Sequence, residues 1–459
     1  MDYFEYSKLL SHNPSEDICL SLIKNVISDQ VLSFGQKYFI YNQLIRKDFL
    51  NQIPDTLLVA EAMDDLYQEI YDELTRELKE DFTYIPYSER NPNLVIVVSN
   101  QVLAVGHAPT KTLFDRCHAL RVMGKELMII NTADLLPRAN AIPWEDAVFG
   151  SYIQEFCELE YLEFKGDFYH FFQCPNTMPE IGMIKMLLDT VKNLKPEAIV
   201  TIGGNNLFSD LCSNLVTTMN VSTVFSGRVT TLGTFQIVSR PLVESDLLWA
   251  KKHGKTKDHF VVGTFTFSLC EQTNSFKRKE LGIPKDSFVG IVSGLRLDSE
   301  IDQNFINLLI KLMKDGLYVV FIGIFDNYEN YINEYPLFRK NSTYLGTQKD
   351  VLSINELCDV FINPHRKGGG TSAVEALVKG VPVITDSYGD VSVCAGPDFS
   401  VNGTEEMYER ISRLMDDIEY RKKMKKLALE RANILLDSDR EFARLYNTVI
   451  QRVKKEESK

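Results

Sequence analysis

The stretch FINPHRKGGGTSAVEALVKGVPVIT, residues 361–385, decides the fold that we expect for this chain. Its apolar start predicts a buried strand that stops at an Asn-Pro pair, and the segment 381–385 predicts a second strand. Between them, Thr371 or Ser372 can cap a helix. Strand, glycine loop and helix thus follow one another, as in a βαβ unit.

The loop before this helix predicts an anion site, because free backbone N–H groups and the helix dipole point at whatever lies there. The helix carries Glu375 in its expected first turn. A crossover with a glycine turn and no ligand is the plainer alternative. The loop supplies three basic side chains, His365, Arg366 and Lys367, which favour a phosphate or pyrophosphate of a nucleotide as the ligand. Three glycines follow them, Gly368, Gly369 and Gly370.

The same segment resembles the C-terminal domain of glycosyltransferases with the GT-B fold, which has a similar strand, Gly-rich turn and "EAL..G.PVI" helix. The likeness covers roughly residues 260–440 well and 90–245 in outline. It implies that the loop and the helix N-terminus hold the diphosphate of a nucleotide-sugar donor, a UDP-sugar, and that Glu375 binds the donor ribose. The implied activity is a metal-independent hexosyl transfer to a glycan, a lipid-linked or a protein acceptor.

Two positions depart from the pattern of family four, which the C-terminal half resembles. Lys367 stands eight positions before Glu375, where retaining members usually have a second glutamate, and Ile301 stands in place of a phosphate-binding lysine. Arg296 is kept, and Arg366 or Lys367 can supply the missing charge. The departures leave two alternatives open: a catalytically inactive GT-B partner that stabilises another glycosyltransferase, and a nucleotide-sugar epimerase.

Composition narrows the class of protein. The net charge of −13 argues against sequence-independent binding of nucleic acid. The N-terminus lacks a signal-peptide pattern and no apolar run could span a membrane, so we expect a cytoplasmic protein. The basic run 421–426 is a solvated helix face or a peripheral membrane contact. Eight scattered cysteines without a CxxC pair argue against a structural zinc site. The resemblance implies that neither a catalytic metal nor a cofactor is needed.

Periodicity predicts three regions. Residues 1–90 read as a helical accessory region without visible chemistry, suited to packing or to a protein partner. Residues 91–245 alternate strands and helices as an N-terminal Rossmann-like acceptor domain, with a strand expected at 222–225. The polar run 249–259 reads as the connection to residues 246–459, a Rossmann-like nucleotide-sugar domain with C-terminal helices. The fold class is therefore α/β, with two doubly wound domains facing a cleft, and the resemblance implies that they are of the GT-B type.

Ligands of such sheets bind at the carboxyl ends of the strands, so the loops 103–111, 203–207, 226–230, 294–300 and 363–372 are the candidates. His107 is the expected general base for an inverting transfer, or a loop histidine that bonds a backbone carbonyl. Gly203, Gly204 and Asn205 could let a substrate approach the backbone, or form a tight turn. Asp386 and Asp390, which follow a predicted strand, could meet a sugar hydroxyl.

Overall fold

The strand β1 (Asn91–Ser99) shows how the first sheet is buried. Its residues 95–98 are all apolar and fully buried, because alternate side chains enter the cores on the two faces of the sheet. Ile96 and Val98 join a core built with helices on one face. A continuous apolar run is what a strand covered on both faces requires.

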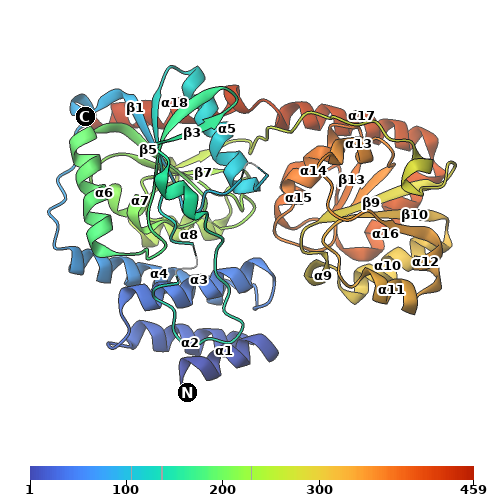
Figure 1. The fold of residues 1–459 in the computed structure, drawn as a ribbon, viewed down its shortest axis with the longest axis horizontal. Helices are drawn as coiled ribbons and strands as arrows, with labels where there is room; N and C mark the ends of the chain where they lie inside the picture. The colour runs from blue at the N-terminus through green and yellow to red at the C-terminus, as the bar shows by residue number, and fades with distance from the viewer. Residues whose placement is uncertain (105, 136–137, 229, 459) are drawn as a thin grey trace. The chain divides into compact units, whose positions relative to one another are not determined.

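The computed structural model describes residues 1–104, 106–135, 138–228 and 230–458. The chain divides into two compact units (Figure 1). Unit 1 comprises Met1–Gly263 together with Ser438–Lys459, and unit 2 comprises Thr264–Asp437.

The first part of unit 1 is helical, as predicted. Its helices are α1 (Tyr3–His12), α2 (Glu16–Ser28), α3 (Phe34–Phe49) and α4 (Leu57–Leu78). The α/β part then consists of β1, α5 (Ala108–Val122), β2 (Glu126–Asn131), β3 (Tyr161–Phe164), β4 (Asp167–Gln173), α6 (Ile181–Leu194), β5 (Pro196–Ile202), α7 (Leu207–Cys212), β6 (Thr218–Val221), β7 (Phe235–Val238), α8 (Glu244–Lys252), β8 (Phe260–Val262) and, from the end of the chain, α18 (Ser438–Glu457).

The sheet of unit 1 has the order β3-β4-β2-β1-β5-β6-β7-β8. Its described strand pairs are parallel, except for the antiparallel pair β3–β4 at one edge. Strand order reverses between β1 and β5, which is the switch point at which doubly wound sheets bind ligands.

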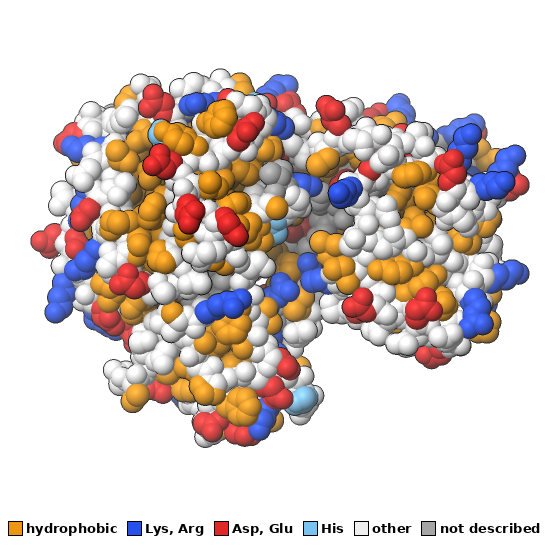
Figure 2. Space-filling view, in the orientation of Figure 1, with side chains coloured by type: hydrophobic (Ala, Val, Ile, Leu, Met, Phe, Trp, Pro, Cys, Tyr) orange, Lys and Arg blue, Asp and Glu red, His pale blue; other side chains and the backbone are white. Residues whose placement is uncertain are grey.

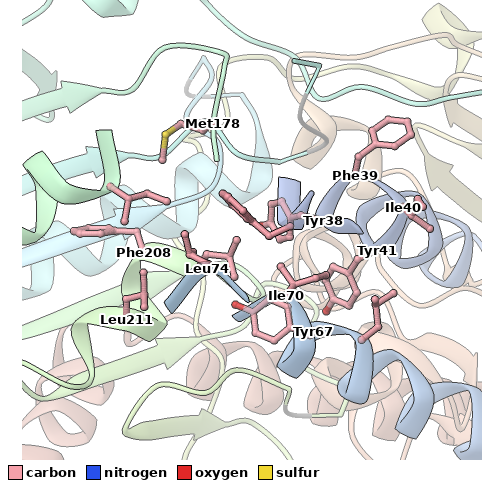
Figure 3. Packing of buried hydrophobic residues seen from close by; sticks show 14 of the residues in the cluster. Tyr38, Phe39, Ile40, Tyr41, Tyr67, Ile70, Leu74, Met178, Phe208 and Leu211 are labelled. Atoms are coloured by element: carbon pink, nitrogen blue, oxygen red, sulfur yellow. The ribbon is translucent and has the colours of Figure 1, made fainter. Parts of the chain in front are cut away.

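The N-terminal helices share a core with this sheet. Tyr38, Phe39, Tyr67, Leu74 and Phe208 belong to one cluster of buried side chains (Figure 3). The cluster also takes in residues of β1, β2 and β5. Residues 1–90 are therefore part of unit 1, and truncating them would expose its hydrophobic core.

Unit 2 is a second α/β layer structure. Its elements are β9 (Phe288–Gly294), α9 (Leu297–Glu300), α10 (Gln303–Lys314), β10 (Leu317–Gly323), α11 (Tyr328–Glu334), α12 (Pro336–Asn341), β11 (Ser342–Tyr344), α13 (Val351–Asn355), β12 (Val360–Ile362), α14 (Gly370–Leu377), β13 (Val383–Asp386), α15 (Gly389–Ala395), β14 (Ser400–Val401), α16 (Gly403–Asp416) and α17 (Ile418–Leu435). The parallel order β11-β10-β9-β12-β13-β14 places the switch point between β9 and β12.

Two local predictions are wrong. Residues 222–225 are not a strand, because β6 ends at Val221. The run 249–259 is not a connection: it contains the end of α8 and a turn of 3₁₀-helix that leads into β8, the last strand of the first sheet. Its polar composition is misleading because Lys255 is half-buried and donates to backbone carbonyls, beside the buried Trp249.

The chain passes between the units at residues 263 and 264, and its last helix returns to unit 1. In α18 the apolar side chains Phe442, Leu445 and Val449 are buried, and Tyr446 donates to Glu197 at 2.7 Å. The sequence predicts a division at 245/246 and assigns these last residues to the second domain. A helical pattern shows which face is apolar, but it does not say against which sheet that face packs.

Candidate functional site

The glycine segment lies at the switch point of the sheet in unit 2. Arg296 lies in the loop after β9, Glu300 ends the short helix α9 that follows this loop, and the loop after β12 holds residues 363–369. Because β9 and β12 are parallel neighbours, these two loops emerge at the same edge of the sheet. The candidate segments 294–300 and 363–372, about 70 residues apart in the chain, are thereby brought together, and Glu300 pairs with an arginine from each of them.

Glu300 bridges the two predicted arginines. Its carboxylate accepts from Arg366 Nη1 at 2.9 Å and pairs with Arg296 Nη2 at 2.8 Å. The Arg366 side chain is buried, whereas that of Arg296 is 31% exposed. Burial lowers the pKa of Arg366, and the carboxylate opposes that effect. The cluster of two guanidinium groups and one carboxylate keeps a net positive charge beside the glycine loop.

Arg366 also supports the glycine loop from within. Its Nε donates to Asn363 Oδ1 at 2.8 Å, and a Cβ added to Gly369 would lie 2.7 Å from Cζ of Arg366. Gly369 has φ +99°, which L side chains rarely adopt. Both observations make glycine necessary at this position.

The helix α14 begins earlier than predicted. Gly369 is its N-cap, so Thr371 and Ser372 lie inside the first turn and Glu375 lies in the second. Thr371 or Ser372 as the cap, and Glu375 in the first turn, were wrong because the positive φ of Gly369 lets the helix start at Gly370. No side chain of the described residues caps this helix, so the N–H groups of its first turn can donate to an anion.

His365 is oriented by its neighbours. Nδ1 of its ring lies 3.0 Å from Asp386 Oδ2, and the ring stacks on Tyr388 with 4.3 Å between the centroids. The other carboxylate oxygen of Asp386 accepts the backbone N–H groups of Ser387 at 3.0 Å and Gly403 at 3.2 Å. Since these contacts hold one edge of the imidazole, the opposite edge with Nε2 is the one that can meet a ligand.

The remaining predicted donor residues line the same loop and helix. Their burial differs: Gly368 and Gly370 are buried, and the side chains at the other positions are half-buried, namely Lys367, Thr371, Ser372 and Glu375. The backbone carbonyl of Lys367 accepts the N–H of Asp390 at 2.7 Å, which fixes the loop against the start of α15.

His107 lies at the switch point of unit 1. It is the N-cap residue of α5 and half-buried, and its Nδ1 is 3.0 Å from Thr110 Oγ1. Burial lowers the pKa of His107 below its ordinary value of 6.5, so the ring is neutral at pH 7. The tautomer in which Nδ1–H donates to Thr110 leaves the Nε2 lone pair available as a base. Val105 and Val229, in two of the predicted loops, lie outside the described residues.

The turn Gly203-Gly204-Asn205 follows β5. Gly203 has φ +137°, which favours glycine. Asn205 is buried, and its amide is occupied: Nδ2 donates to Tyr41 Oη at 2.5 Å, and Oδ1 accepts from Thr230 at 2.6 Å. The sequence did not reveal that the side chain of Asn205 ties the N-terminal helices to this turn.

Other features of the described residues concern metals, membranes and charge. They include no group of three His, Cys, Asp or Glu side chains arranged to hold a metal ion. None of the described helices is long and apolar enough to cross a membrane. On the face in Figure 2, acidic and basic side chains are interspersed.

Comparison with known proteins agrees with this geometry. Residues 274–431, which contain the glycine segment, match the model of the family described as "Glycosyl transferases group 1". None of the curated proteins matches the chain. A glycosyltransferase from Rickettsia africae is similar in structure, with a TM-score of 0.54 and 14% identity, over 80% of this chain and 99% of that one.

A mutant of the O-GlcNAc transferase of Thermobaculum terrenum is similar over 98% of this chain and 90% of its own, with a TM-score of 0.56 and 12% identity. At such low identity these likenesses concern the fold. The chain has the GT-B fold of glycosyltransferases, and the resemblance stated from the sequence is confirmed. The family match supports glycosyl transfer as the general activity.

Proposed function

We propose that this protein transfers a sugar from a nucleotide-sugar donor, bound at the glycine loop of unit 2, to a glycan, lipid-linked or protein acceptor. One observation carries the proposal: the N-terminus of α14, free of a side-chain cap from the described residues, follows a glycine loop in the segment that matches the glycosyltransferase family. A diphosphate would accept the N–H groups there and would be stabilised by the helix dipole.

The basic residues around the glycine loop have different proposed roles. Arg366 is buried beneath the loop and paired with Glu300, so we propose that it positions the loop. Arg296 and Lys367 are more exposed and would meet the diphosphate. As the bond from the anomeric carbon to the diphosphate oxygen breaks, the negative charge that develops on that oxygen would be stabilised by these cations without a metal.

His365 would act at the same group. Protonated, it would donate Nε2–H to the departing diphosphate while Asp386 accepts from Nδ1–H. This is the arrangement in which a carboxylate fixes the tautomer and the orientation of a catalytic imidazole. Glu375, half-buried in the second turn of α14, would accept a hydrogen bond from the donor ribose.

His107 in unit 1 would be the base if the reaction inverts the anomeric configuration. Its neutral ring would take the proton of the acceptor hydroxyl at Nε2 as that oxygen bonds to the anomeric carbon. A UDP-sugar is the donor to test first, since the resemblance implies it. The O-GlcNAc transferase among the similar structures makes UDP-GlcNAc a natural member of the panel.

A panel of nucleotide sugars tests the binding part of this proposal. A donor present at 100 times its dissociation constant stabilises the native state by about 2.7 kcal/mol. One UDP-sugar is expected to raise the melting temperature, and Glu375→Ala to reduce that rise by removing a ribose contact. If no nucleotide sugar stabilises the wild-type chain, the donor site is not at this loop.

A further inference from the structure

A cavity of about 410 Å³ lies within unit 1, among the N-terminal helices and the segment 144–149. α1 contributes Leu10 and Ser11, and the C-terminal end of α3 contributes Gln43, Arg46 and Lys47. The volume falls within the range of about 300–1,000 Å³ that small-molecule sites occupy. It belongs to none of the loops discussed above.

The side of the cavity formed by Asp146 and Val148 is held in place by the side chain of Gln43. Gln43 is buried, its Nε2 donates to the carbonyl of Val148 at 2.8 Å, and its Oε1 accepts the N–H of Val148 at 2.9 Å. These two hydrogen bonds fix the segment that contributes Asp146 and Val148 to the lining of the cavity. A wall anchored by two hydrogen bonds is preformed, which reduces the ordering cost of binding.

Lys47 puts a positive charge into the cavity wall. Its side chain is more than nine-tenths buried, and its Nζ donates to Ser11 Oγ at 3.1 Å. An ammonium group carries three N–H donors, and the described part of the chain offers this one a single hydrogen-bond acceptor. Glu145 and Asp146 act on it through space, but burial outweighs them and lowers the pKa of Lys47.

The balance of charge in the lining favours an anion. Arg46 and Lys47 are cationic, and Asp146 is anionic and exposed. Burying an ammonium without full compensation is costly, so a negatively charged group placed beside Nζ would stabilise both itself and the protein. The rest of the lining is partly apolar and would cover a hydrocarbon body, with surfaces from Leu10, Pro14, Leu50 and Val148.

We propose that this cavity binds a small organic anion, whose phosphate or carboxylate head meets Lys47 Nζ and whose apolar body lies against Leu10 and Val148. The anionic head accepts hydrogen bonds from two of the N–H groups of the Lys47 ammonium, and Ser11 Oγ accepts from the third. The site is separate from the glycine loop, which belongs to unit 2, and it does not depend on the glycosyltransferase proposal.

Calorimetric titration of the full-length protein with n-hexyl phosphate and with hexanoate tests this site. For ligands of this size we expect a dissociation constant of about 1 mM or below for at least one of them. The head that binds identifies the ligand as a phosphate monoester or a carboxylate. Inorganic phosphate lacks the hydrocarbon chain and 1-hexanol lacks the charged head. Each is expected to bind at least about tenfold more weakly than the better of the two probes.

Three variants make the test specific. Lys47→Met keeps the size of the side chain and removes the charge, and is expected to weaken binding by about tenfold or more. Val148→Trp leaves Lys47 in place but fills the cavity, and is expected to abolish binding. Lys24→Met, at an exposed position of α2, is the matched control and is expected to bind as wild type.

Thermal unfolding establishes that each variant is folded. The proposal is wrong if neither probe binds the wild-type protein, if Lys47→Met and Val148→Trp both bind as tightly as wild type, or if 1-hexanol binds as well as its charged counterparts.

Discussion

Gly369→Ala tests the glycine loop with one added methyl group. At φ +99° an alanine costs about 1–2 kcal/mol, because its Cβ approaches the following carbonyl. The same Cβ would lie 2.7 Å from Cζ and Nε of Arg366, a side chain bonded to both Asn363 and Glu300. Displacing one of these charge-assisted bonds adds about 1.5–3 kcal/mol. The total loss of unfolding free energy is therefore about 2.5–5 kcal/mol.

Donor binding is expected to fall as well, since the N–H groups of α14 follow Gly369 directly. Misaligning one hydrogen bond to the charged diphosphate costs about 1.5–3 kcal/mol, and each 1.4 kcal/mol is about tenfold in affinity. We expect calorimetric titration with the best nucleotide sugar to show affinity reduced by about tenfold to a hundredfold, measured below the melting temperature of the variant.

Gly316→Ala is the matched control. Gly316 has φ +106°, but a Cβ there meets nothing within 4 Å. This variant is expected to lose only the backbone cost of about 1–2 kcal/mol and to bind the donor as wild type. Equal destabilisation of the two variants would refute the contact with Arg366. Unchanged donor affinity in Gly369→Ala would refute the donor site.

Three further perturbations follow from the buried charges and the candidate base. Glu300→Gln leaves the buried Arg366 without its ionic partner and is expected to cost about 3–5 kcal/mol in chemical denaturation; a loss below about 1 kcal/mol would contradict the pairing. His107→Ala is expected to slow an inverting transfer by about 100-fold at unchanged donor affinity. Because the pKa of His107 is lowered, protonation of this base is expected to slow the wild-type transfer only as the pH falls below its ordinary value of 6.5; near-normal transfer by the variant would remove His107 from the mechanism. Burial raises the pKa of Asp134 to about 6, above its unfolded value of 3.8, so this group's contribution to stability is present below pH 4 and is lost as the pH rises to about 6. Asp134→Asn is expected to remove about 3 kcal/mol of that pH dependence, and an unchanged slope of unfolding free energy against pH would show that Asp134 is not its source.

The sequence predicts most of the fold where the pattern is local. Helices such as α6 have apolar residues at helical spacing, and strands such as β1 are uninterrupted apolar runs, so both can be identified without tertiary information. The hairpin β3–β4 was missed because its exposed face carries aromatic side chains, Tyr161 and Phe168 among them, which break the alternation of apolar and polar residues.

The position of the candidate site can be predicted from the sequence, but most of the hydrogen bonds and ion pairs between its residues cannot. The glycines and basic residues of the segment 365–370 identify the loop by their spacing. The bond between Arg366 and Glu300 joins residues 66 positions apart, and only the strand order brings them together. Arg296 and Glu300 are spaced i, i+4, so this pair alone could have been anticipated from the sequence.

The central claim, that this chain transfers sugar from a nucleotide-sugar donor, is tested most directly by ³¹P and ¹H NMR of the purified protein incubated with a panel of nucleotide sugars. We expect one donor to be consumed, with release of its nucleoside diphosphate and appearance of the sugar on an acceptor or, slowly, on water. A donor that binds but is never consumed would identify an inactive partner of another glycosyltransferase, and an epimerised donor would identify an epimerase; either result would contradict the claim.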